Sequence, residues 1–164
     1  MSTTTIPPPR RIYFSTSVSG GRSNIQDARK LIFAIERRVP DALILTKHLV
    51  DPEIEELERQ WVVGQWKKGS GGSICERDLS LLDSANCLVA EASQSSSGVG
   101  AEIYYALYKV GIQVLCLWRM GTHCSPMLAE NTHSLLTAQM YQDDVAMQQA
   151  VNRFFDDFGR VWSK

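Results

Sequence analysis

The sequence has no long apolar run, no signal-peptide pattern and no cluster of basic residues. Its longest apolar stretch is far shorter than the roughly 18 residues that a membrane-spanning helix needs, and the first residues are rich in Thr and Pro. The 164-residue chain has a formal net charge of −1. Because nucleic-acid polymers are bound through many phosphate contacts, this balance argues against such a partner. We expect a cytoplasmic protein, with the nucleus also open, and no membrane partner.

Metal-binding cysteine patterns are also missing. The four cysteines, Cys75, Cys87, Cys116 and Cys124, form no C-x-x-C pair. Cys87 and Cys116 lie in apolar stretches, where we expect buried thiols that behave as small hydrophobic side chains. His123 and Cys124 are adjacent, but two neighbouring ligands without a second pair are a weak metal signal. We therefore expect no metal and no organic cofactor.

The chain does contain an alternation of apolar strands and amphipathic helices. We expect strands at 11–15, 42–46, 86–91, 112–118 and, more weakly, 138–141. We expect helices at 24–38, 74–83, from the turn at 93–100 to about 110, 126–131 and 143–162. Strands that alternate with helices form a parallel sheet with right-handed crossovers. The expected fold is a doubly wound, flavodoxin- or Rossmann-like α/β domain, with about five parallel strands in three α/β/α layers.

Two regions fall outside this alternation. Residues 1–10 are expected to be a disordered tail, so that residues 11–164 form one domain. Residues 47–73 are a long excursion, in which 53–68 has the pattern of a charged helix that carries Trp61 and Trp66. Such a segment, closed by glycines, is either a mobile lid or a surface helix.

Two loops carry the candidate ligand-binding residues. Residues 16–22 follow the first strand, and residues 94–100 follow the third strand and precede a helix. In doubly wound sheets, ligands bind beyond the carboxyl ends of the strands. Both loops combine glycines with hydroxyl groups, which suits a small anion such as phosphate, although ordinary turns have the same composition. No P-loop is present, and Ile103 replaces the third glycine of a dinucleotide-binding motif.

Three side chains near these loops are candidates for chemistry. Glu102 is expected in the first turn of the helix that follows the second loop, where the helix dipole favours its ionised form. An acid there can also simply stabilise the helix. Asp78 lies on the preceding helix, where the alternative is a solvated surface acid. Tyr13 lies in the first strand, where the alternative is a core aromatic residue.

Together, these motifs resemble those of the nucleoside 2-deoxyribosyltransferase superfamily, and in particular its branch of 2′-deoxynucleoside 5′-phosphate N-hydrolases. The resemblance is carried by IYF at 12–14 with SVSGGR at 17–22, TKH at 46–48, ERDL at 76–79, SSGVGAE at 96–102 and, more weakly, SPM at 125–127. The order and spacing hold from about residue 11 to 130. This combination is more specific than any of its short pieces.

The resemblance implies a role for each matching residue. Glu102 would attack C1′ of the sugar to form a deoxyribosyl-enzyme, Asp78 would protonate or hydrogen-bond the departing base, and Tyr13 would lie beside the sugar. His48 would lie near the site. Ser125 would reach the 5′-phosphate from a neighbouring subunit, which implies a homodimer. The other residues around the phosphate would be Ser17, Val18, Ser19, Gly20, Gly21, Ser96 and Gly98.

Three positions depart from the family pattern. Tyr104 replaces a small residue, Ser19 stands where a close relative has arginine, and Thr16 stands where it has glycine. The predicted function is hydrolysis of the N-glycosidic bond of 2′-deoxynucleoside 5′-monophosphates, which gives the free base and 2-deoxyribose 5-phosphate. The alternatives are a nucleoside 2-deoxyribosyltransferase, a ribonucleotide N-hydrolase and a non-catalytic nucleotide-binding module.

Overall fold

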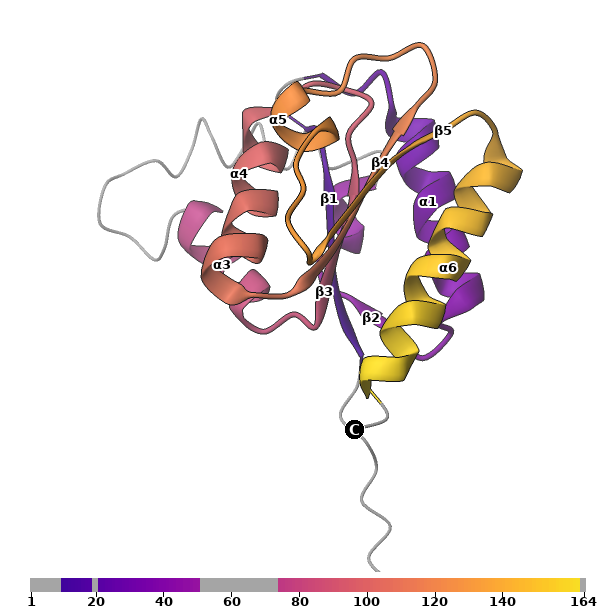
Figure 1. Ribbon diagram of the computed structural model, residues 1–164. Coiled ribbons are helices and arrows are strands. Elements are labelled where there is room, and N and C mark those ends of the chain that lie inside the picture. Colours follow the sequence, from indigo (N-terminus) through magenta and orange to yellow (C-terminus); the bar gives the residue numbers. More distant parts are fainter. Residues whose placement is uncertain (1–9, 19–20, 51–73, 163–164) are drawn as a thin grey trace, which may run out of the picture.

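The computed structural model describes residues 10–18, 21–50 and 74–162, with side chains as far as Phe158 (Figure 1). Most of the expected N-terminal tail and the part of the excursion that carries Trp61 and Trp66 lie outside these residues. None of the helices in the described part of the chain is long and apolar enough to cross a lipid bilayer.

Five parallel strands form one sheet, in the order β2-β1-β3-β4-β5. The strands are β1 (Arg11–Thr16), β2 (Leu43–Ile44), β3 (Cys87–Glu91), β4 (Gln113–Arg119) and β5 (Leu136–Tyr141). The predicted doubly wound α/β fold is therefore confirmed. The strand order reverses between β1 and β3, whose carboxyl ends meet where Thr16 pairs with Glu91. This is the position at which such folds bind ligands.

Helices cover both faces of the sheet (Figure 1). On one face lie α1 (Ile25–Arg38) and α6 (Asp144–Trp162). On the other face lie α3 (Ile74–Asp83), α4 (Ser97–Tyr105) and the short α5 (Pro126–Ala129). A 3₁₀-helix, η1 (Lys47–Val50), follows β2, and a π-helical turn, η2 (Ala106–Val110), extends α4.

The two-residue period of the strands sorts their side chains between two cores. In β1, Ile12 and Phe14 pack with α1 and α6, whereas Tyr13 packs with α3 and α4. Ser15 points in the same direction as Tyr13, and Thr16 points towards α1, where it bonds a side chain at the start of that helix. Because of this alternation, Ser15 bonds a side chain on one face of the sheet and Thr16 bonds a side chain on the other.

Two strands differ from their predicted lengths by at least two residues. The second strand is only two residues long, because the Thr46 hydroxyl bonds both the N–H and the C=O of Phe14 and the chain then turns into η1. The last strand begins earlier than expected, at Leu136. The prediction that Cys87 and Cys116 are buried is confirmed.

Candidate active site

The carboxylate of Glu102 points from α4 towards the end of β1. The Tyr13 hydroxyl donates a hydrogen bond to its Oε1 atom over 2.8 Å, and the Ser15 hydroxyl donates one to its Oε2 atom. Tyr13 and Ser15 are both completely buried, whereas Glu102 is half-buried. Both carboxylate oxygens are therefore held in one orientation at a site that ligands can reach.

Glu102 lies in the second turn of α4, so its predicted place in the first turn is wrong. Ser96 caps the helix by accepting a hydrogen bond from the Val99 N–H over 3.4 Å, which makes Ser97 the first helical residue. Burial is the largest influence, and it raises the pKa of Glu102 above its ordinary value, although the hydroxyl groups of Ser15 and Tyr13 oppose this.

Ser15 is a site residue that the sequence reasoning missed. Its hydroxyl bonds Glu102 as directly as that of Tyr13 does. A signal was present, because residues two apart in a strand face the same side of a sheet. Once Tyr13 was assigned to the site, the same face of β1 also contained Ser15.

Asp78 and Arg77 act electrostatically on Glu102, Tyr13 and His48. The negative charge of Asp78 raises the pKa of both Glu102 and Tyr13, which requires it to lie near them. Arg77 pairs with Asp78 at 2.9 Å, and the Asp78 side chain is only 18% exposed. Asp78 is thus not the solvated surface acid that was its alternative, and the structure brings it together with Glu102 and Tyr13.

The two titratable rings of the site have opposite shifts. Burial, followed by the negative charges of Glu102 and Asp78, raises the pKa of Tyr13 well above its usual range, so its hydroxyl stays a hydrogen-bond donor. Burial and then the positive charge of Arg77 lower the pKa of His48, against the influence of Asp78. His48 therefore interacts electrostatically with both members of the Asp78–Arg77 pair.

The two Gly/Ser loops meet at their outer ends. The Ser23 hydroxyl donates to Gln94 Oε1 over 2.5 Å, and a Cβ atom at Gly21 would lie 3.5 Å from the same side chain. Gly21 has a φ of 114°, which glycine adopts without strain. Its N–H bonds the Val18 carbonyl over 3.4 Å. Ser19 and Gly20 lie outside the described residues.

Ser17 and Gly98 leave room and hydrogen-bonding capacity at these loops. Ser17 is 2% exposed, and its hydroxyl has no hydrogen-bond partner in the described part of the chain. An unpaired buried hydroxyl costs about 1–3 kcal/mol, so a bound polar group would relieve it. A Cβ atom at Gly98 would meet only Ser96 Oγ, at 3.7 Å, so open space adjoins the start of α4.

Ser125 lies at the start of α5. It is exposed and caps α5, and it lines a cavity of about 510 Å³ that Ser96 and Tyr104 also line. Tyr104, the departure from the family pattern, donates to the Met127 carbonyl over 3.2 Å and stacks on Tyr108. Tyr104 therefore joins α4 to α5, and the described wall of this cavity does not include Glu102.

No group of three or more His, Cys, Asp or Glu side chains in the described ranges is arranged to hold a metal ion. The fold and the site thus define an α/β protein with a half-buried carboxylate, hydrogen-bonded at both oxygens, beside the point where the strand order of its sheet reverses.

Comparison with known proteins identifies the family. A protein of Methanosarcina mazei named "Putative 2′-deoxynucleoside 5′-phosphate N-hydrolase 1" is 33% identical over 145 residues, which are 88% of this chain and 83% of that protein. A protein of the same name from Nematostella vectensis is 35% identical over 83% of this chain and 88% of its own length. The 5-hydroxymethyl-dUMP N-hydrolase of Rattus norvegicus is 34% identical over 68% of this chain and 62% of its own length.

None of the protein-family models searched matches the chain. The relatives nevertheless cover most of it, and the resemblance noted in the sequence is confirmed. The chain belongs to the 2′-deoxynucleoside 5′-phosphate N-hydrolase family.

Proposed function

We propose that this protein hydrolyses the N-glycosidic bond of 2′-deoxynucleoside 5′-monophosphates, releasing the free base and 2-deoxyribose 5-phosphate. The observation that carries the proposal is the Glu102 carboxylate, held at both oxygens by Tyr13 and Ser15. The names of the relatives support the substrate class, since they describe N-hydrolases of deoxynucleoside 5′-phosphates and of 5-hydroxymethyl-dUMP.

Glu102 acts as the nucleophile in this proposal. In retaining glycosidases, a carboxylate displaces the leaving group at the anomeric carbon, and water then hydrolyses the covalent intermediate. Here a Glu102 oxygen bonds to C1′ as the C1′–N bond breaks and its electron pair leaves with the base. The hydroxyl groups of Tyr13 and Ser15 support this role, because they hold the carboxylate in a fixed orientation before the substrate arrives.

Asp78 assists the departing base. A nucleobase is a poor leaving group unless it is protonated or hydrogen-bonded as the bond breaks. The charge of Asp78 acts on Glu102, and Arg77 holds the Oδ1 atom of Asp78 at 2.9 Å. His48, beside this pair, adds a polar group on the same side. Water then attacks C1′ and passes a proton to the Asp78 carboxylate, which has given its own proton to the base, while the bond between C1′ and Glu102 breaks and releases the sugar phosphate.

The two loops at the carboxyl ends of β1 and β3 bind the 5′-phosphate. The buried Ser17 hydroxyl lacks a partner in the described chain, and the first N–H groups of α4 are available beside Ser96. Helix N-termini and serine hydroxyls are favourable partners for phosphate. Phosphate bound there would fix the sugar, so that binding energy far from C1′ serves the reaction.

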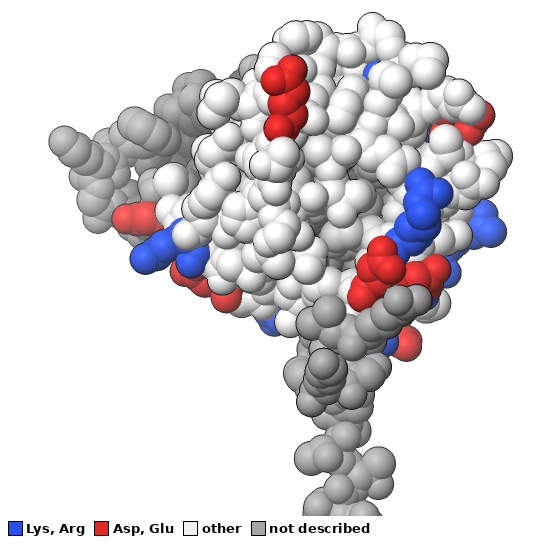
Figure 2. All heavy atoms as spheres, in the orientation of Figure 1, with Lys and Arg blue, Asp and Glu red and all other residues white. Residues whose placement is uncertain are grey.

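A second copy of the chain completes the site. The face over α4, α5 and β5 carries few charged side chains (Figure 2). Exposed apolar side chains on these elements and beside them are Tyr108, Met127 and Met140. Such a face is typical of subunit interfaces. In the dimer we propose, Ser125 of one subunit contacts the phosphate held by the other, and its exposed position on α5 leaves it accessible to a second chain.

We place the reaction in the cytoplasm, with the nucleus as the alternative. The described cysteines are free thiols, and Cys116 and Cys124 contact each other without a disulfide. Free thiols that lie together fit a reducing compartment.

The test is to incubate the protein with matched deoxynucleoside and ribonucleoside monophosphates, including 5-hydroxymethyl-dUMP, and to measure released base and sugar phosphate. We expect base and 2-deoxyribose 5-phosphate in equal amounts from at least one deoxynucleotide. A second, labelled base added to the assay separates hydrolysis from transfer, because a transferase would incorporate it into nucleotide. Release from ribonucleotides alone, or from no substrate, would overturn the proposal.

A further inference from the structure

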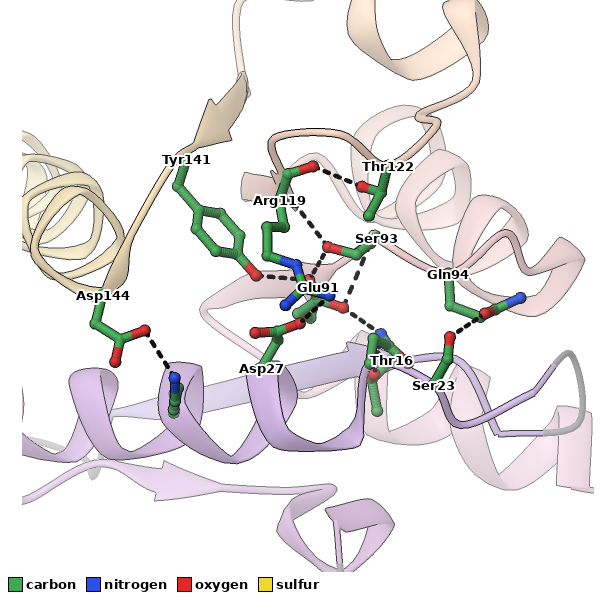
Figure 3. Close-up of polar contacts among 12 residues, drawn as sticks. Thr16, Ser23, Asp27, Glu91, Ser93, Gln94, Arg119, Thr122, Tyr141 and Asp144 are labelled. Carbon is green, nitrogen blue, oxygen red and sulfur yellow. Dashed lines mark hydrogen bonds and ion pairs between the residues drawn. The ribbon is translucent and has the colours of Figure 1, made fainter.

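A second polar cluster lies at the carboxyl ends of the same strands as the candidate active site. It lies on the opposite face of the sheet, against α1 (Figure 3). At its centre is Glu91, the last residue of β3, which is completely buried. Its carboxylate accepts hydrogen bonds from the side chains of Asn24, Ser93 and Tyr141. The Ser93 N–H adds a further bond, over 3.3 Å.

These donors connect Glu91 to both proposed phosphate loops. Asn24 ends the loop after β1, and it also donates to the Thr16 hydroxyl over 3.3 Å. Ser93 lies between β3 and α4, directly before the loop at 94–100, and its hydroxyl accepts a bond from the Arg119 N–H over 2.8 Å. Tyr141 differs from them, because it comes from β5 and its hydroxyl bonds Glu91 over 3.1 Å.

Asn24 has an unusual role for its position. It is the N-cap residue of α1, where an asparagine side chain ordinarily accepts a hydrogen bond from the first helical turn. Here no such bond forms, and the side chain bonds Glu91 and Thr16 instead. The helix α1 therefore lacks the stabilisation of a side-chain cap, and the Asn24 side chain instead joins the loop to the sheet.

We infer that Glu91 is a positioning residue that holds the two loops in one arrangement and thereby sets the preference for a 5′-phosphorylated over a non-phosphorylated substrate. The inference rests on the proposed function. This role explains why β3 ends in a buried acid, although Val89, its neighbour on the same face of the strand, is apolar. A well-packed apolar residue is often at least as stabilising as a buried charge.

Hydrogen bonds offset part of the cost of burying the Glu91 carboxylate. Besides burial, the charge of Asp27 raises the pKa of Glu91, and Arg119 pairs with Asp27 at 3.3 Å. Burial raises the pKa of Glu91, while the hydrogen bonds from Ser93, Asn24 and Tyr141 act against that rise. Removing any one of these donors should therefore disfavour the ionised form of Glu91 and also remove one hydrogen bond that holds its neighbours. The loops also touch at their outer ends through Ser23 and Gln94, so they are joined at two levels.

The test compares three variants that each disturb Glu91. Glu91→Gln and Asn24→Ala release the loops, whereas Tyr141→Phe removes a bond to the same carboxylate but leaves both loop links in place. The quantity measured is the ratio of kcat/KM for a 2′-deoxynucleoside 5′-monophosphate to that for its deoxynucleoside. We expect this ratio to fall about tenfold or more in Glu91→Gln and Asn24→Ala, and to stay within about twofold in Tyr141→Phe.

The affinity for 2-deoxyribose 5-phosphate, measured by calorimetry, is a second readout that needs no turnover. It should fall in Glu91→Gln and Asn24→Ala only. All assays are run below the onset of thermal unfolding of each variant. Equal losses in all three variants, or unchanged ratios and affinities in Glu91→Gln and Asn24→Ala, would overturn the inference. A wild-type protein that releases no base contradicts the proposed function instead, and the binding measurement still tests Glu91.

Discussion

At the scale of single residues, the proposed chemistry depends on Glu102, whose carboxylate accepts hydrogen bonds from two hydroxyl groups. We expect Glu102→Gln to reduce base release by about 10³-fold or more, because the amide keeps the size of the side chain but loses the negative charge and the nucleophilicity. The measurement is base release under single-turnover conditions, with thermal unfolding as the check on folding. Glu130→Gln is the control, since Glu130 is exposed on the surface. A Glu102→Gln variant with a tenth of wild-type activity would contradict the assignment.

The Ser15 hydroxyl is expected to set the pH range of the reaction. It lowers the pKa of Glu102, so Ser15→Ala should raise that pKa further, and the ionised nucleophile should then form only at higher pH. The acid limb of the kcat/KM profile should move up by about one pH unit, since a bond to a charged group is worth roughly 1.5–3 kcal/mol. Ser15→Thr keeps the hydroxyl and should restore the profile. An unmoved limb in Ser15→Ala would mean that the bond does not affect the ionised state.

The candidate catalytic residues could be predicted from sequence motifs, but the contacts and burial that surround them could not. Glu102, Asp78 and Tyr13 stand in recognisable stretches, and the structure brings them together. Ser15 was missed because it stands in no motif and a serine in a strand has no distinctive pattern. The raised pKa of Glu102 was not predicted, because burial depends on the packing of α4 against β1 and no local pattern encodes it.

At the scale of elements, the loops after β1 and β3 can be tested through a contrast between two serines. Ser96 caps α4, so Ser96→Ala should lower the free energy of unfolding by about 1 kcal/mol. Ser17 has no partner in the described chain, so Ser17→Ala should leave that free energy unchanged or raise it slightly. Denaturant unfolding measures both effects.

Activity measurements should show whether Ser17 binds the phosphate or only supports the fold. Ser17→Ala should lower kcat/KM for a 5′-monophosphate by about tenfold, without a comparable loss for the deoxynucleoside. Loss of stability together with equal activity losses on both substrates would mean that Ser17 serves the fold and not the phosphate.

The alternation of strands and helices was predictable because each element has its own hydrophobic period. The start of α4 was not, since Ser93, Ser95, Ser96 and Ser97 are all acceptable caps. The tertiary contacts select among them: Ser93 bonds Glu91, which leaves Ser96 to cap the helix. The length of β2 was mispredicted for a similar reason, because the Thr46 side chain replaces strand pairing with bonds to Phe14.

For the whole molecule, the prediction concerns assembly. Met127 and Val145 are almost equally exposed, at 65% and 66%, but they lie on opposite sides of the sheet. Met127→Glu should convert the dimer to a monomer of low activity, because it places a charge in the proposed apolar interface, whereas Val145→Glu should change neither property. Sedimentation at micromolar concentration measures the change. A fully active wild-type monomer would contradict the prediction.

Mixing two weak variants tests whether Ser125 acts across the interface. In a heterodimer of Glu102→Gln and Ser125→Ala subunits, one site would contain both an intact Glu102 and an intact Ser125 from the other chain. Activity should therefore rise well above the average of the two homodimers. No rise, despite subunit exchange shown by mass spectrometry, would mean that Ser125 acts within its own chain or not at all.

The parallel sheet also has a consequence for how the protein is made. Glu102 is 89 residues from Tyr13 and 87 from Ser15 along the chain, and β1 pairs with β3 across a similar separation. Contacts between such distant residues form slowly, because a long stretch of chain must be ordered before they add stability. During synthesis, β1 leaves the ribosome long before its central partner strand exists. No short N-terminal fragment can thus hold the nucleophile with its two hydroxyl groups, and the site forms only once the middle of the sheet has closed.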